Sequence, residues 1–249
     1  MSNSLENRMK KDYEDRNKYY LPRRTNAIIR IDGKNFSKYT KGLKDPYDED
    51  MIRAMEETMK SLCKEIQGVK FGYTQSDEIN LLLKDDDKPT TEAFYDNNIQ
   101  KMASISASMT TAFFNHFMSM FSDHQELACF DARVFTIPQL VEFENYFIWI
   151  NKDGIRNSIN SYGRSVFSHK QLENKNTKEI IEMCSNENKE WEEEIEEYKY
   201  GSICYKKENL KDLDRKKWVV TPAFNFIHER DDFKQLLYSE ITDNEIYHG

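Results

Sequence analysis

The pattern of apolar and polar residues predicts strands and helices in alternation over the first half of the chain. The segment NAIIRIDG (26–33) holds an apolar run and ends on Asp-Gly, which is typical of a strand that enters a turn. FGYTQSDEINLLL (71–83) indicates two strands joined by a polar turn. Between them, EDMIRAMEETMKSLCKEI (49–66) carries apolar residues at helical spacing, and Asp48 is placed to cap that helix.

The second half of the chain is expected to be more helical. Residues 94–117 suit a long helix rich in small residues, and 127–136 form a strand candidate. Pro138 is expected to start a helix that continues through 151–167. The remaining third reads as charged and helical, except for strand candidates at 202–207 and 218–222.

This order of elements predicts the fold class. Strand, helix, hairpin, helix and strand imply an α+β fold, with helices packed on one face of a mainly antiparallel, ferredoxin-like sheet. In that arrangement the end of the first strand lies beside the turn of the central hairpin. Asp32 and Asp77 would therefore meet in space, although they are far apart in the sequence.

Composition narrows the class of protein without identifying a ligand. The chain has 249 residues, of which 38% are hydrophobic and only 5 are proline, and this favours a folded globular protein. Four scattered cysteines disfavour a disulfide framework or a zinc site and suggest a reducing compartment. We see no signal peptide, transit peptide or membrane-spanning run, so we expect a soluble cytoplasmic protein without a membrane partner. The net charge of −8 does not favour a polyanion partner, but basic residues also cluster locally.

The two acids carry the candidate chemistry. Two divalent ions held by shared carboxylates can clamp the attacking and leaving oxygens of a nucleotidyl transfer, and magnesium needs few protein ligands. Asp32, Asp77 and the carbonyl of Gly33 would suffice, while Lys34, Asn35 and Ser76 could donate to phosphates. The alternative is plain: Asp-Gly and Ser-Asp-Glu are common polar turns with no ligand at all.

Several motifs together carry a resemblance to a known family. The chain resembles the tRNA(His) guanylyltransferase family, and within it the guanylyltransferase-like branch of 3′–5′ RNA polymerases. The likeness runs in order over nearly the whole chain, through RIDGKNF (30–36), QSDEINLLL (75–83), NNIQKMASISASMTTAFFN (97–115), FDARVF (130–135), WINKDGIRNSI (149–159) and SVFSHKQLENKN (165–176).

The resemblance implies a polymerase-palm fold, two Mg²⁺ ions, ATP and GTP or other NTPs as substrates, and a homotetramer. It implies a palm-like catalytic domain at 1–140, and a mainly helical RNA-interaction region at 141–249 packed on it as one continuous unit. Asp32 and Asp77 would bind metal with the Gly33 carbonyl, and Glu78 would be a further catalytic acid. Nucleotide contacts are expected from Asp32, Gly33, Lys34, Asn35, Phe36, Ser37, Ser76, Asp77, Lys101 and Arg133.

Departures from the family pattern bear on the substrate. Ile155 stands at a position that is histidine in the eukaryotic guanylyltransferases, Ser37 replaces another family histidine, and Asn98 stands where an arginine is usual. These differences favour template-directed repair of 5′-truncated tRNA over addition of a single G to tRNA(His). A palm-fold nucleotidyl cyclase and a catalytically silent RNA-binding module remain as alternatives.

Several residues outside the acid pair have two possible roles each. Arg156 and Asn157 could touch RNA or merely cap a helix, and His169 and Lys170 could contact RNA phosphates or lie on a solvated helix end. Trp149 and its aromatic neighbours are expected in the core.

Overall fold

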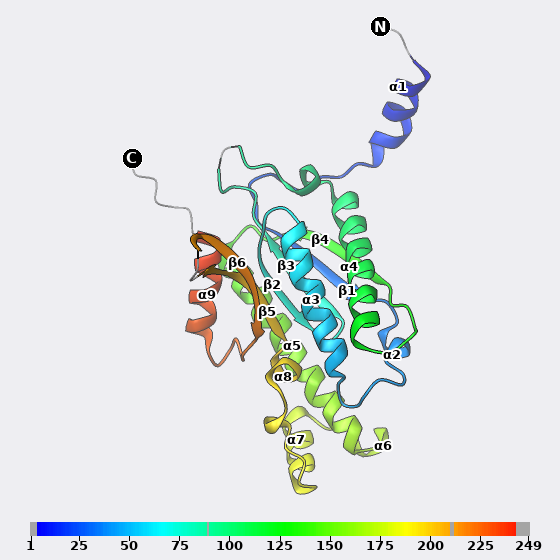
Figure 1. Cartoon of the computed structure of the whole chain (residues 1–249), viewed down its shortest axis with the longest axis vertical. Coiled ribbons are helices and arrows are strands. Elements are labelled where there is room, and N and C mark those ends of the chain that lie inside the picture. Colours follow the sequence, from blue (N-terminus) through cyan, green and yellow to red (C-terminus); the bar gives the residue numbers. More distant parts are fainter. Residues whose placement is uncertain (1–3, 89, 210–211, 243–249) are drawn as a thin grey trace.

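The computed structural model describes residues 4–88, 90–209 and 212–242. Among these residues, six strands form one sheet in the order β4-β1-β3-β2-β5-β6, and every neighbouring pair is antiparallel. Figure 1 shows the sheet in the middle of the molecule. Its strands are β1 (Ala27–Gly33), β2 (Val69–Gln75), β3 (Glu78–Leu83), β4 (Phe130–Thr136), β5 (Ser202–Asn209) and β6 (Asp212–Pro222).

Two long helices cover one face of the sheet. They are α3 (Glu49–Glu65) and α4 (Ile99–Phe121), which lie side by side in Figure 1. The inward residues of β1 and β3 pack against the methionines of α3 to form a core; Ile29, Leu81 and Met59 are fully buried in it. As expected, the Asp48 side chain caps α3 by accepting from the Met51 amide.

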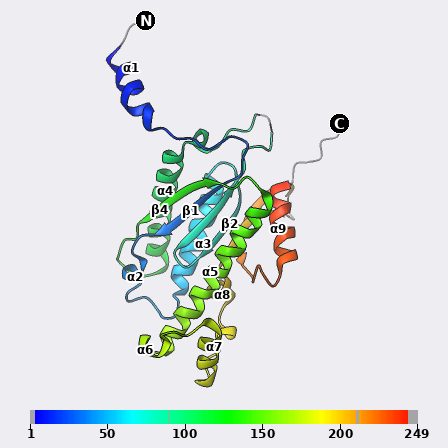
Figure 2. The same cartoon turned by 180° about the vertical axis from the view of Figure 1, so that it is seen from behind.

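The opposite face is covered by α5 (Leu140–Val166) and α9 (Arg230–Thr242), and Figure 2 shows α5 running across it. Aromatic rings from both helices and from the sheet fill this second core; Phe71, Phe147 and Phe233 are fully buried. Helices therefore cover both faces of the sheet, which corrects the expectation of a single covered face. The apolar residues of α5 pack against the side chains of β1, β2 and β3 that point away from α3 and α4.

The far half of α5 supports a small helical lobe at the lower end of Figure 1. There it packs on α7 (Thr177–Asn186) and α8 (Glu196–Tyr200) around Ile180, Cys184 and Trp191. The acidic residues within 192–197 lie in the segment that is expected to be charged and helical. Instead they divide between a 3-10 turn and α8.

Shorter helical elements join these layers. The first of them extends away from the body of the molecule in Figure 1. They are α1 (Leu5–Met9), η1 (Lys10–Glu14), η2 (Asp15–Asn17), α2 (Phe36–Tyr39), η3 (Phe94–Asn97), α6 (His169–Leu172) and η4 (Trp191–Glu193).

The expected antiparallel α+β fold is confirmed. The strand pairing also crosses the proposed domain boundary at residue 140, because β5 pairs with β2 and β6 extends the sheet further. The C-terminal portion thus contributes strands as well as helices. No helix among the described residues has the length and apolar character needed to cross a bilayer.

Candidate active site

The end of β1 and the β2–β3 turn meet at one edge of the sheet, as the topology predicts. The Gly33 amide donates to the carbonyl oxygen of Asp77 at 3.1 Å, and Asp32 lies directly opposite Glu78 across the β1–β3 pair. Two acids that are 45 positions apart in the chain are thereby brought to one place.

The turn that carries Asp77 is shaped by its own side chains. Ser76 adopts a left-handed backbone (φ 52°), and its hydroxyl donates to Asp77 Oδ1 at 3.1 Å. The Thr74 hydroxyl closes the turn by donating to the Glu78 carbonyl at 2.8 Å. These bonds hold the Asp77 carboxylate towards β1.

Gly33 is required because that carboxylate approaches its backbone closely. A Cβ added at Gly33 would lie 2.8 Å from Asp77 Oδ2 and would clash with the ring of Phe36. Any other residue would therefore displace the Phe36 ring and the Asp77 carboxylate.

Burial makes the negative charge of Asp77 unfavourable in the absence of a cation. Burial is the largest cause, the neighbouring Asp32 acts in the same direction, and hydrogen bonds oppose them; together they raise the pKa of the Asp77 carboxyl from 3.8 to about 6. A bound cation would relieve both effects.

The donor set has the composition that magnesium accepts. No group of three or more His, Cys, Asp or Glu side chains within the described residues could hold a metal. The expected metal ligands at the strand ends remain the carboxylates of Asp32 and Asp77 and the carbonyl of Gly33. That set suits magnesium, which keeps its waters and the phosphates of its substrate, and not structural zinc.

Glu78 is differently placed, because both of its carboxylate oxygens are already engaged. Oε2 pairs with Arg30 Nη2 at 2.5 Å, and Oε1 accepts from Asn80 at 2.6 Å. Tyr146 on α5 in turn donates to Asn80 at 2.5 Å. Burial raises the pKa of Glu78, while Asn80 and Arg30 lower it. In this structure Glu78 holds Arg30 and Asn80, and its expected role as a catalytic acid stays a prediction.

A cavity of about 480 Å³ opens beside the paired acids. Its size lies within the range of small-molecule sites and suits a single nucleotide. One wall is the strand ends, another is the loop at 43–48 with the start of α3, and a third is the middle of α5, from Ile150 to Arg164. Lys44 and Arg164 contribute positive charge to this lining.

Three of the expected nucleotide ligands, Asp32, Ser76 and Asp77, line the cavity. Lys34, Asn35 and Ser37 are exposed just beyond the end of β1, and Arg133 Nη2 is 3.8 Å from Asp32 Oδ2. Phe36 differs, because its ring is buried against Tyr39, Phe114 and Phe130. Only the backbone of Phe36 is left for a ligand.

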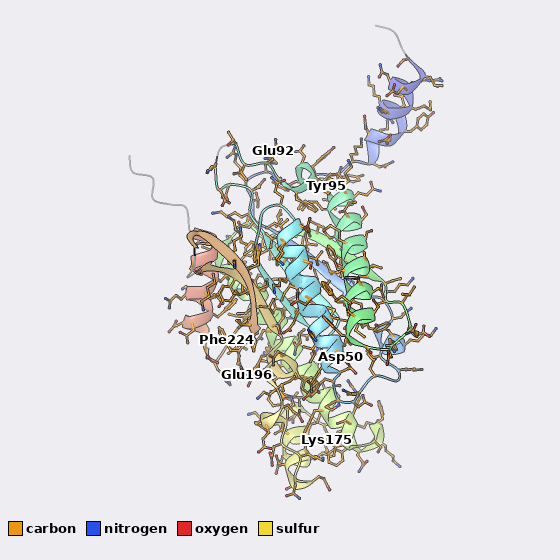
Figure 3. The ribbon with its side chains drawn as sticks, viewed as in Figure 1. Asp50, Glu92, Tyr95, Lys175, Glu196 and Phe224 are labelled. Atoms are coloured by element: carbon orange, nitrogen blue, oxygen red, sulfur yellow. The ribbon has the colours of Figure 1, made fainter. Side chains whose placement is uncertain are left out.

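Lys101 is the exception among the expected nucleotide ligands. It lies in the first turn of α4 and lines a second cavity with Tyr95 and Arg23. Figure 3 shows Tyr95 near the top of the body of the molecule, well above Asp50, which lies in the first turn of α3. The topology explains this separation. Because β3 runs antiparallel to β1, the helix that follows β3 begins at the other end of the sheet from Gly33.

The expected RNA ligands are dispersed. Asn157 lines the main cavity, and its amide donates to Asp153 at 3.4 Å. Arg156 is exposed and pairs with Asp153 at 2.5 Å. His169 and Lys170 are exposed on α6, in the helical lobe, and neither lines the cavity.

Sequence reasoning missed several cavity residues. Lys44 and the rest of its loop carry no periodic pattern, so nothing local linked them to Asp32. Arg164 was visible only as part of a basic cluster. A signal for Arg30 did exist, since a lone cation within an apolar strand needs a buried partner.

Comparisons with known proteins identify relatives of the whole chain. A bacterial tRNA(His) guanylyltransferase (Thg1)-like protein solved in complex with ATP is 38% identical, with a TM-score of 0.85 over 94% of this chain and 99% of that one. A similar protein in complex with GTP is 37% identical with a TM-score of 0.81, covering 94% of this chain and 99% of that one. An uncharacterized protein of Acanthamoeba polyphaga mimivirus is 30% identical over 79% of this chain and 75% of its own length.

Other comparisons match about half of the chain. The probable tRNA(His) guanylyltransferase of Drosophila melanogaster is 27% identical over 51% of this chain, and the chain spans 44% of its length. The family model described as tRNA(His) guanylyltransferase matches residues 6–138.

The fold, together with these relatives, indicates a nucleotidyltransferase. The matched family model and the full-length structural relatives then settle which one: the chain belongs to the tRNA(His) guanylyltransferase family.

Proposed function

We propose that this protein is a metal-dependent enzyme that adds nucleotides to the 5′ end of tRNA or a related RNA, in the 3′–5′ direction. The observation that supports this most is the junction of Asp32, Gly33 and Asp77 at the edge of a nucleotide-sized cavity. The relatives solved with ATP and with GTP support nucleotide substrates for this chain.

Asp32, Asp77 and the carbonyl of Gly33 would hold two Mg²⁺ ions, as the donor set and the unfavourable charge of Asp77 suggest. When bound, the ions would activate the attacking hydroxyl and stabilise charge on the phosphate. Lys44 and Arg164 would neutralise the triphosphate, and Lys34, Asn35, Ser37 and Ser76 would orient it.

The reaction has two steps for a 5′-monophosphorylated RNA. The terminal phosphate attacks the α-phosphate of ATP, and pyrophosphate leaves. The 3′-hydroxyl of the incoming NTP then attacks the RNA 5′ phosphorus, loses its proton and displaces AMP. A 5′-triphosphate end needs no activation and releases pyrophosphate in a single step.

We infer that the addition is templated and repairs 5′-truncated tRNA. The support comes from the resemblance, because Ile155, Ser37 and Asn98 depart from the pattern of the enzymes that add G to tRNA(His).

The decisive assay is incorporation of each labelled NTP onto tRNAs that lack one or more 5′ nucleotides, with every base in turn at the opposing 3′ position. We expect the complementary nucleotide to be incorporated, and we expect the Asp77→Ala variant to be inactive. Asp123→Asn, which changes an exposed acid beyond α4, is the matched control and should be fully active.

The alternatives predict different results in the same assay. Indifference to the opposing base, with G added to tRNA(His), would favour the dedicated guanylyltransferase. A cyclic nucleotide formed without RNA would favour a cyclase, and RNA binding without turnover would favour a silent module. Full activity of Asp77→Ala would contradict the assigned site.

A further inference from the structure

Trp149 is unusually exposed for a large aromatic residue on a core helix. Its side chain is 52% accessible, in contrast to the core position expected from the sequence. It lies on α5 one turn before Asp153, which lines the main cavity. Its ring contacts Tyr146 edge-on at 5.8 Å between centroids.

The indole is held in place by a polar network. Arg30 stacks on it, with the guanidinium carbon 5.5 Å from the ring centroid. Arg30 is itself fixed by Glu78, and Glu78 by Asn80, which accepts from Tyr146. An exposed, flat and pre-oriented ring therefore stands at the rim of the site.

This ring lies outside the cavity that would hold a nucleotide. Arg30 and Asp32 line that cavity, whereas Trp149 and Arg133 do not. Arg133 is 60% exposed and reaches to 3.8 Å from Asp32. The rim of the cavity beside β1 thus exposes the flat ring of Trp149 and the cation of Arg133. A second substrate that extends out of the cavity could contact both.

An aromatic face combined with an exposed cation matches the chemistry of a nucleic-acid end. Bases stack on aromatic side chains regardless of their identity, and arginine contacts the phosphates. A nucleotide inside the cavity would not reach Trp149. The acceptor RNA, whose 5′ end must come to Asp32 and Asp77, would extend over it.

We propose that Trp149 stacks on the terminal base of the acceptor RNA, beside a phosphate contacted by Arg133. The stack would align the RNA 5′ phosphorus with the acids, which makes Trp149 an RNA-positioning residue. This inference rests on the proposed function, since it assumes that RNA is the second substrate.

The test measures binding separately from chemistry. In an Asp77→Asn background, affinity for a 5′-monophosphorylated hairpin RNA and for ATP is measured for Trp149→Ala and Trp149→Phe. We expect Trp149→Ala to weaken RNA binding about 5- to 100-fold, as for the loss of one stacked base, and to leave ATP binding unchanged. Trp149→Phe should recover most of the loss. RNA binding should also quench the part of the tryptophan fluorescence that comes from Trp149. This quenching should be absent in Trp149→Phe.

Trp218→Phe is the matched control, because that indole lies on β6 against Lys206, away from the cavity lining. It should leave RNA binding unaltered. Unchanged RNA affinity in Trp149→Ala would overturn the stacking proposal alone. A parallel loss of ATP affinity would also overturn it, because the ring would then serve the nucleotide. Failure of the parent protein to bind RNA at all would overturn the proposed function and the stack together.

Discussion

Replacing Asp77 by asparagine is expected to stabilise the metal-free protein while it abolishes nucleotide addition. The carboxylate of Asp77 is poorly solvated and faces Asp32, so its charged form is disfavoured in the native state. Asparagine keeps the shape of the side chain and removes the charge. The same substitution should therefore improve stability and eliminate the activity.

The direction of the pH dependence follows from the raised pKa. Between pH 4 and about pH 6 the native protein keeps the Asp77 proton, whereas the unfolded chain has lost it. The free energy of unfolding therefore falls as pH rises through that window, and the loss is complete above about pH 6. A shift of about two units corresponds to at most about 3 kcal/mol at 1.36 kcal/mol per unit. Because the side chain borders an open cavity, we expect about 1 to 2 kcal/mol.

Thermal unfolding in EDTA measures this difference. For a chain of this size, about 1 to 2 kcal/mol corresponds to a rise in Tm of about 2 to 8 °C for Asp77→Asn at pH 7.5. The two proteins should converge near pH 4. Added Mg²⁺ should raise the Tm of the wild type and leave the variant unaffected, because a ligand that binds only the native state stabilises it.

Asp131→Asn is the matched control for this measurement. Asp131 lies opposite Asp32 at the same end of the sheet, but its side chain is 59% exposed and pairs only loosely with Arg133. Its Tm should change little. A lower Tm for Asp77→Asn in EDTA at pH 7.5, or a difference that does not vary with pH, would refute the electrostatic reasoning.

Two further substitutions probe the geometry of the site. Tyr146→Phe removes the hydroxyl that donates to Asn80. The free energy of unfolding, measured by urea titration, should fall by about 1 to 3 kcal/mol. An unchanged midpoint would mean that water replaces the hydroxyl. Gly33→Ala places a methyl group against the Phe36 ring and 2.8 Å from Asp77 Oδ2. We expect the free energy of unfolding to fall by about 1 to 3 kcal/mol and nucleotide addition to be lost. Retained activity would show that the ring and the carboxylate can move aside without harm.

The acid pair could be predicted because it depends on topology alone. Antiparallel pairing of the first strand with the hairpin forces Asp32 beside Asp77, whatever the loops do. The same argument, applied to α4, shows that Lys101 lies at the other end of the sheet. The strand directions alone place Lys101 at that end. The motif that suggested Lys101 as a nucleotide ligand does not say which end of the helix faces the site.

The cavity walls could not be predicted in the same way. Helical periodicity showed that α5 has an apolar stripe, but it does not say which neighbour covers each turn. Trp149 fits the apolar pattern and is nevertheless half exposed, because Arg30 and the edge of the sheet lie beside it and no further apolar layer does. The loop around Lys44 is placed by tertiary contacts with α3 and α5, which leave no periodic signal.

The pairing of β5 with β2 has a consequence for synthesis of the protein. Gly72 pairs with Cys204, so one edge of the strand that leads to Ser76 and Asp77 has no partner until more than a hundred further residues have been made. At roughly 5 to 20 residues per second, that edge waits on the order of 7 to 26 s on the ribosome. An unpaired strand edge attracts other chains. The growing chain is therefore most vulnerable to aggregation during this interval, when its catalytic hairpin is already formed but its sheet is still incomplete.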